Sequence, residues 1–150
     1  MGVTAGLCLV PAEEFVPRED GSVMPKLPKD AVWIDLDKAW WEFGEVLRDM
    51  PEPLNLAIDG DLCLEEKRSE DSRKDDATCL TFVTPGTVAE IARGLEPIDS
   101  DEIMEFLEQA KLSTPGDEWE RETYSEYFEH LKEAYRTAAR QGAGLAILFC

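Results

Sequence analysis

The feature that most constrains the fold lies in the last third of the chain. Large apolar side chains recur there at spacings of three and four residues, which predicts one long amphipathic helix. Its stripe consists of Tyr124, Tyr127, Phe128, Leu131, Ala134, Tyr135 and Ala138. Gly142 is well placed to end this helix, and the apolar run Ala143–Phe149 that follows predicts a central strand. We therefore expect a small sheet that is covered by helices.

Two other segments predict strands, and one predicts a loop. The run Val3–Val10 indicates an interior strand, and Cys79–Val83 indicates a second one. Residues 65–76 contain no apolar side chain and predict a flexible polar loop. Helices and strands do not alternate regularly, so the fold class is α+β. We expect a single domain over residues 1–150, with a small mixed sheet whose N-terminal and C-terminal strands are covered by several helices.

Three more helices are predicted before the long one. The first spans about 35–50, with Asp35 and Asp37 in its first turn, where the helix dipole favours negative charge. The second begins after Thr84, which is interpreted as its N-cap. The third begins after Asp99, a capping residue of the same kind.

The charge balance limits the partners that this chain can have. It carries 33 acidic and 15 basic residues, a net charge of −18. Nucleic-acid backbones and anionic membrane surfaces would be repelled, so we expect neither as a partner. The start of the chain has no basic residue before its first apolar run and does not resemble a secretory signal, which predicts a cytoplasmic location.

More than half of the excess negative charge lies in residues 96–133, which hold thirteen acids and three bases. This segment is interpreted in two ways: as a solvated surface that keeps the protein soluble, or as an acidic face that docks a basic protein. The residues predicted to bind such a partner are Glu118, Glu120, Glu122, Glu126 and Glu129. Neutralising them should weaken binding and leave the fold intact.

A rival hypothesis is a small-molecule binder or an enzyme. Its pocket would lie between the helix at 35–50 and the proline-rich loop at 17–30, with Trp41 as a wall and Asp37 and Lys38 at the rim. Each of these residues also has an ordinary structural interpretation, as a packed aromatic side chain, a helix-start acid and a surface lysine. The oligomeric state cannot be read from the sequence.

Motifs for catalysis or metal binding are scarce. The single histidine, His130, is near Glu126, Glu129 and Glu133 and is interpreted either as a boundary residue or as a general base. The four cysteines form no CxxC pair and are interpreted either as small buried apolar residues or as reactive or disulfide-bonded thiols, of which we favour the first. Asp59-Gly60-Asp61 stops short of a calcium loop and predicts a turn. We therefore expect no metal and no cofactor.

An ordered set of segments resembles a known family. They are Met1-Gly2 before a strand, Asp35 to Trp40, Thr81 to Pro85 with Val88 to Ala92, and Tyr127 to Leu131 running to Gly142. Together they resemble the DUF1877 or YfbM-like family of small bacterial proteins of unknown function. The resemblance implies an α+β fold and a cytoplasmic, bacterial origin, and it brings no activity or catalytic residues.

The chain departs from this family at two positions. Gly44 stands where the family typically carries a histidine, and residues 74–78 replace a Gly-Tyr-Gly-type turn. If either feature forms a site in the family, this chain lacks it. The leading functional hypothesis from the sequence is accordingly a non-enzymatic interaction protein, of an immunity-like or regulatory kind.

Overall fold

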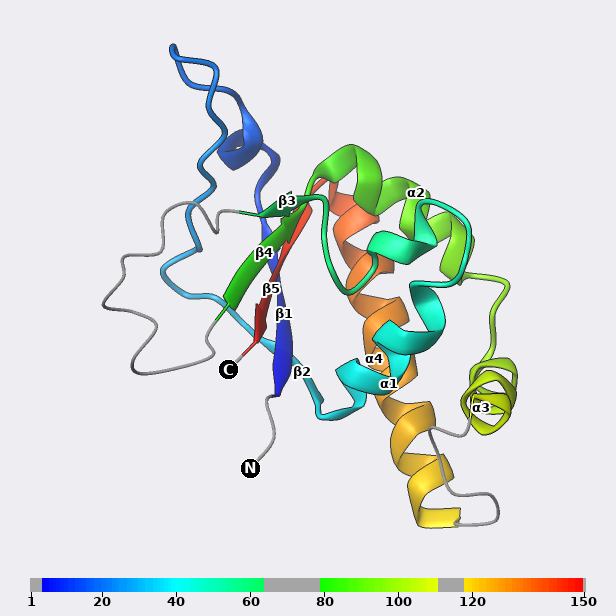
Figure 1. The fold of residues 1–150 in the computed structure, drawn as a ribbon. Helices are drawn as coiled ribbons and strands as arrows, with labels where there is room; N and C mark the ends of the chain where they lie inside the picture. The colour runs from blue at the N-terminus through cyan, green and yellow to red at the C-terminus, as the bar shows by residue number, and fades with distance from the viewer. Residues whose placement is uncertain (1–3, 64–78, 111–117, 150) are drawn as a thin grey trace.

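The computed structural model describes residues 4–63, 79–110 and 118–149, which form one antiparallel sheet and the helices that cover it (Figure 1). The strands are β1 (Ala5–Val10), β2 (Ile34–Asp37), β3 (Leu62–Cys63), β4 (Cys79–Val83) and β5 (Gly144–Phe149). The helices are α1 (Ala39–Leu47), α2 (Pro85–Leu95), α3 (Ser100–Gln109) and α4 (Glu118–Gln141), with short 3-10 turns η1 (Ala12–Phe15) and η2 (Leu54–Leu56). The α+β class is confirmed. The predicted loop at 65–76 lies outside the described residues.

The strand order is β2-β1-β5-β4-β3, so β5 is central and β1 is interior, as predicted. Every described strand pair is antiparallel, and the expectation of a mixed sheet is corrected on this point. Val83 at the end of β4 pairs with Leu145 at the start of β5. The three helices between these strands therefore leave and return at the same end of the sheet, which makes the two neighbours antiparallel.

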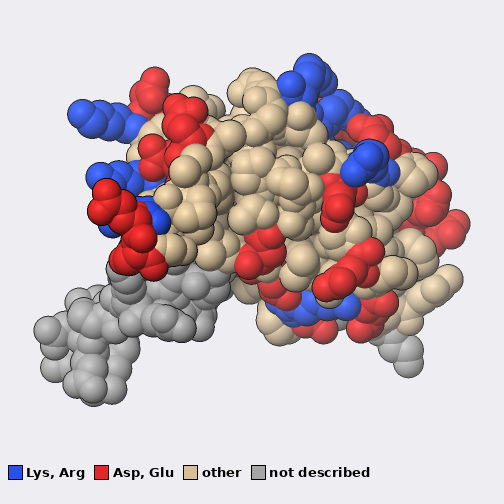
Figure 2. Space-filling model, turned by 90° about the horizontal axis from the view of Figure 1, so that it is seen from above, with Lys and Arg blue, Asp and Glu red and all other residues tan. Residues whose placement is uncertain are grey.

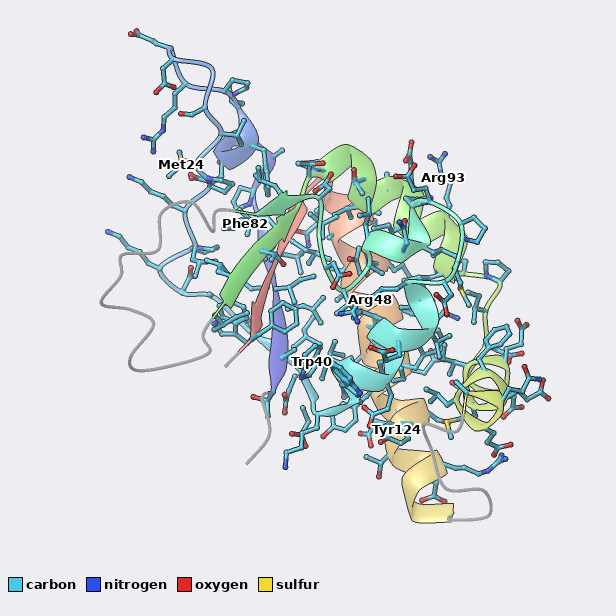
Figure 3. All side chains as sticks on the ribbon, in the orientation of Figure 1. Met24, Trp40, Arg48, Phe82, Arg93 and Tyr124 are labelled. Carbon is cyan, nitrogen blue, oxygen red and sulfur yellow. The ribbon has the colours of Figure 1, made fainter. Side chains whose placement is uncertain are left out.

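The helices lie on one face of the sheet, where the main core forms (Figure 1). In β1 the buried Ala5 and Leu7 point into this core, whereas Val10 joins a smaller cluster with Phe82 and Ala146. Figure 3 shows Phe82 on the side of the sheet away from the helices. Leu7 and Val10 face opposite sides of the sheet because successive side chains of a strand point alternately to its two faces.

An aromatic cluster joins α1 to α4. The ring of Phe43 meets the ring of Phe128 edge-on at 5.6 Å between centroids and that of Tyr124 at 6.2 Å. Phe43 and Phe128 are fully buried.

A second buried ring of α4, Tyr135, lies one turn beyond Leu131. Its hydroxyl donates to the carbonyl of Ala57 at 2.6 Å, and burial raises the pKa of this phenol. Figure 3 shows Trp40 of α1 and Tyr124 of α4 toward the same end of the molecule.

The prediction of one helix over 35–50 is wrong at its beginning. Residues Ile34–Asp37 form strand β2, in which Asp35 pairs with Gly6, and α1 begins only at Ala39. Asp35 and Asp37 therefore do not lie in a first helical turn. The apolar Leu36 is buried, and its position fits the repeat of a helix as well as that of a strand. The segment forms a strand because pairing with β1 supplies hydrogen bonds to its backbone. Asp37, with φ at 47°, then turns the chain out of the strand.

Both ends of α2 are held by charged side chains from other elements. Thr84 is the N-cap, as predicted, yet its own side chain makes no cap bond. The carboxylate of Asp61 accepts from the Thr84 amide at 2.9 Å and from the hydroxyls of Thr84 and Thr87 at 2.7 and 2.6 Å. At the carboxyl end, the buried Lys132 ammonium donates to the carbonyl of the C-cap residue Glu96 at 3.4 Å and to that of Ile98 at 2.8 Å. Both charges have the sign that the helix dipole favours.

Two other predicted helix ends are confirmed. The Asp99 side chain accepts from the amide of Glu102 at 2.8 Å at the start of α3. Gly142 follows α4 with φ at 66°, a left-handed conformation in which glycine ends helices without strain.

Candidate functional site

A groove of about 690 Å³ lies between strand β2 and helix α4. Its lining includes three carboxylates, three rings and two smaller side chains: Asp35, Glu126, Glu133, Trp33, Tyr127, His130, Ile34 and Thr123. Its lining combines aromatic walls with carboxylates, which suits a ligand that carries positive charge.

The two sides of the groove are built in different ways. The α4 side consists of residues 123, 126, 127, 130 and 133, whose spacings of three and four place them on one face of the helix. Phe128 and Leu131 on the neighbouring face are fully buried and hold this helix against the sheet. The other side is three consecutive residues, 33–35, at the start of β2. The core contacts of α4 therefore fix its polar face beside the strand.

The groove carries negative charge. Among the described residues neither lysine nor arginine lines it, and Asp35 and Glu126 are exposed acids. The negative charge of Glu133 is partly compensated, because its carboxylate accepts hydrogen bonds from Arg136 at 2.5 Å and from the Thr137 hydroxyl at 3.2 Å. Asp35 and Glu126 are consequently the carboxylates best placed to attract a cation into the groove.

Tyr127 links the groove to Asp37. Its hydroxyl donates to the Asp37 carboxylate at 3.4 Å, and the Asp37 amide donates to the Asp35 carboxylate at 2.8 Å. Desolvation raises the pKa of the Tyr127 phenol above its ordinary value, and the negative charges of Asp37 and Asp35 raise it further. The phenol thus stays protonated and remains a hydrogen-bond donor at neutral pH.

Replacing Asp37 by asparagine should lower the pKa of Tyr127 toward the ordinary tyrosine value, because the phenolate would lose a neighbouring negative charge. Asparagine tolerates the left-handed backbone at this position, so the fold should persist. The measurement is an NMR titration of ring-labelled tyrosine. Tyr124 serves as the internal reference, and an unchanged Tyr127 pKa would contradict the assignment.

His130 lies in the groove, half-buried, with its ring edge-on to Tyr127 at 5.9 Å between centroids. A general base is normally oriented by a hydrogen bond to a carboxylate. Among the described residues the contact seen at His130 is this aromatic one.

None of the three residues predicted for a pocket near the first helix lines the β2–α4 groove, and Asp37 alone of these contacts a residue that does. Asp37 ends β2 and contacts Tyr127 at the groove, and Lys38 is the exposed residue that precedes α1. Trp41 is 51% exposed and packs edge-on against Trp40, and it does not line the β2–α4 groove. The aromatic wall of the groove is Trp33, which is 37% exposed.

The residues predicted for an acidic docking face lie along α4. Glu122, Glu126 and Glu129 are exposed, and Glu126 alone of these lines the groove. Glu129 accepts from the Ser100 hydroxyl at 2.9 Å. Glu118 and Glu120 belong to α4, and their side chains lie outside the described part. Figure 2 shows acidic and basic side chains interleaved toward the two ends of one face. That face, seen from above and away from the beginning of α4 (Figure 1), is not a continuous acidic surface.

The predicted turn at Asp59-Gly60-Asp61 is confirmed, and both of its acids have protein partners. Arg48 binds the Asp59 carboxylate with two nitrogens, at 2.8 and 2.9 Å, and Asp61 caps α2. The Arg48 guanidinium also lies 3.3 Å from the position of a Cβ on Gly44, and so it fills the space beside that residue. Within the described segments, no cluster of three or more histidine, cysteine or acidic side chains is arranged to hold a metal ion.

Sequence reasoning missed Trp33, Ile34 and Asp35 as site residues. The sequence signal that could have found them is the apolar run from Val32 to Ile34 directly before Asp35. In the structure Val32 and Trp33 are exposed. None of the helices in the described ranges is long and apolar enough to span a membrane.

Comparisons with known proteins give a family and a fold. A model of the family described as "Domain of unknown function (DUF1877)" matches residues 11–149. A solved structure, that of a protein of unknown function named YfbM from Escherichia coli, matches with a TM-score of 0.59 and 19% sequence identity. The match covers 98% of this chain and 99% of that one. No curated protein matches the sequence.

Proposed function

The chain belongs to the DUF1877 family, whose function is unknown, and from this premise we propose that it is a protein-interaction module. Its β2–α4 groove holds a basic segment of a partner protein. This proposal narrows the acidic docking face predicted from the sequence to one groove, in which Glu126 is joined by Asp35 and Trp33.

The observation that carries the proposal is the composition of the groove. Three acids and an exposed tryptophan line it, and within the described part of the chain no lysine or arginine does. A partner's guanidinium or ammonium group would find carboxylates at Asp35 and Glu126 and an aromatic face at Trp33, which together favour a cation. Charge complementarity of this kind raises association rates and rejects acidic partners.

The groove is a better candidate than the whole acidic segment for a structural reason. Several acids of residues 96–133 already have protein partners, since Glu108 pairs with Arg121 and Glu96 with Arg136. Neutralised acids attract a basic partner weakly. Exposed pairs of this kind are also screened by salt and contribute little to binding.

The test is the binding of a short peptide in which arginine alternates with threonine. The wild-type chain should bind it in the micromolar range at low salt, measured by calorimetry. The double variant Asp35→Asn with Glu126→Gln should bind about 10-fold more weakly, because two charge contacts are lost.

The matched control is Glu122→Gln with Glu129→Gln, which removes the same charge from exposed sites on α4 that do not line the groove. It should change the affinity by less than about 3-fold. Equal losses in both double variants would mean that the groove has no special role. A peptide of alternating glutamate and threonine that binds as well as the basic one would overturn the proposal outright.

The alternative of a small-molecule binder or an enzyme has one observation in its favour. His130 and Tyr127 lie next to each other in the groove, where a histidine and a phenol could exchange protons with a bound molecule. The two functions separate in one experiment. His130→Gln would abolish such chemistry, whereas it should leave the affinity for a basic peptide within about 3-fold of wild type, because the charged contacts remain.

A further inference from the structure

We infer that the partner's basic segment binds as an extended strand that adds to the free edge of β2. This inference rests on the proposed function and deepens it, since it states the backbone conformation of the partner. Strand addition is a common way for a sheet to bind a peptide: main-chain hydrogen bonds supply affinity, and alternate side chains supply specificity.

Strand β2 is at the edge of the sheet. The order β2-β1-β5-β4-β3 gives it one neighbour, β1, and within the described residues no strand pairs with its other side. An unpaired edge presents amide and carbonyl groups that are ready to pair with another chain.

The groove follows this edge and does not lie over either face of the sheet. Ile34 is paired with Leu7, whose side chain points into the main core beneath the helices. Asp35 is paired with Gly6. Gly6 alternates with Leu7 and so faces the opposite side, where the Trp33 ring lies 3.5 Å from the position of a Cβ on Gly6.

Residues from both faces of β2 therefore line one hollow, as expected of a hollow that runs past the strand's edge. Helix α4 forms the opposite wall. A strand placed there would have backbone partners on β2 other than the Asp37 amide, which already donates to the Asp35 carboxylate. Its side chains would point alternately toward α4 and toward Trp33.

The two walls differ in length. The lining on the strand side, residues 33–35, extends over about 10 Å. The lining of α4 from Thr123 to Glu133 extends over about 15 Å. A segment of three or four extended residues would fit along the strand side.

Charge decides which chain can occupy the edge. In a second copy of this protein, β2 would bring its own Asp35 into a groove that already holds Asp35 and Glu126. Like charges facing one another across paired strands are destabilising. Acids at an edge are also a known protection against self-pairing. A segment with alternating basic residues has the opposite charge and is the occupant to which the groove is complementary.

The experiment compares two peptides with identical side chains. One is the alternating arginine–threonine peptide, and the other carries N-methyl groups on its central amides, which removes the donors that a ladder needs. The unmethylated peptide should bind at least 10-fold more tightly, a free-energy difference of about 1.4 kcal/mol. On binding it should also slow hydrogen exchange of backbone amides in Ile34–Asp37.

The outcomes separate this inference from the proposed function. If both peptides bind equally, and Asp35→Asn with Glu126→Gln weakens both, the groove binds basic side chains and strand addition is overturned. If neither peptide binds, both proposals fail. The remaining outcome is that the chain sediments as a dimer without peptide while the backbone amides of Ile34–Asp37 are protected from hydrogen exchange. In that case a second copy is the occupant, and the inference is likewise overturned.

Discussion

Replacing Phe43 by alanine should lower the free energy of unfolding by about 3–5 kcal/mol, the usual cost of removing a buried phenylalanine ring. The side chain is fully buried, and it contacts the ring of Phe128 at 5.6 Å and that of Tyr124 at 6.2 Å. Its loss leaves a cavity where α1 packs on α4. Because α4 also forms one wall of the groove, the packing of this cluster helps to fix the position of that wall.

The measurement is chemical denaturation followed by circular dichroism. The matched control is Trp41→Ala, which removes a larger ring from the same helix. Trp41 is 51% exposed and touches mainly Trp40, so its loss should cost about 1 kcal/mol or less. Similar losses at the two positions would show that α1 does not bury the face assigned to it.

Replacing Gly60 by alanine should cost about 2–4 kcal/mol, because the strained backbone and the steric clash act together. Gly60 has φ at 77°, a region that side chains disfavour. An added Cβ would also lie 2.6 Å from the backbone carbonyl oxygen of Phe82 and 3.1 Å from the hydroxyl of Thr81. The carbonyl belongs to strand β4 and cannot move aside without disturbing the sheet.

Gly86→Ala provides the control. A Cβ at Gly86 would meet no atom within 4 Å, and this glycine lies inside α2, where alanine is favoured. The control should be neutral or stabilising by up to about 1 kcal/mol, chiefly through the unfolded chain. If thermal unfolding gave equal midpoints for the two variants, the turn before β3 would have a different backbone from the one described.

Much of the fold is predictable because local signals and packing agree. The stripe of α4, the glycine that ends it and the apolar run of β5 all point to the same structure. Asp99 likewise caps α3 as its position indicates. The error at β2 arises because Leu36 satisfies both the helical repeat and the strand repeat. The pairing that decides between them comes from β1, about thirty residues earlier.

The candidate site is predictable only on its helical side. The spacing of Glu126, Tyr127 and His130 places them together on α4, and this follows from the sequence. The strand side depends on which strand lies at the edge of the sheet, and this is a tertiary property that the repeat of β2 does not contain. The sequence does not show that Trp33 lies beside an edge strand, so the prediction of an aromatic wall falls on Trp41 of α1 and misses Trp33.

The two charged side chains at the ends of α2 make this helix depend on the rest of the molecule. Asp61 comes from the residues before β3, and Lys132 from the middle of α4, so each end is held by a group distant in the chain. A segment of eleven residues is too short to be stable alone. Its amides should therefore be released only in openings that also separate α4 from the sheet, so that α2 and α4 lose their order as one cooperative unit.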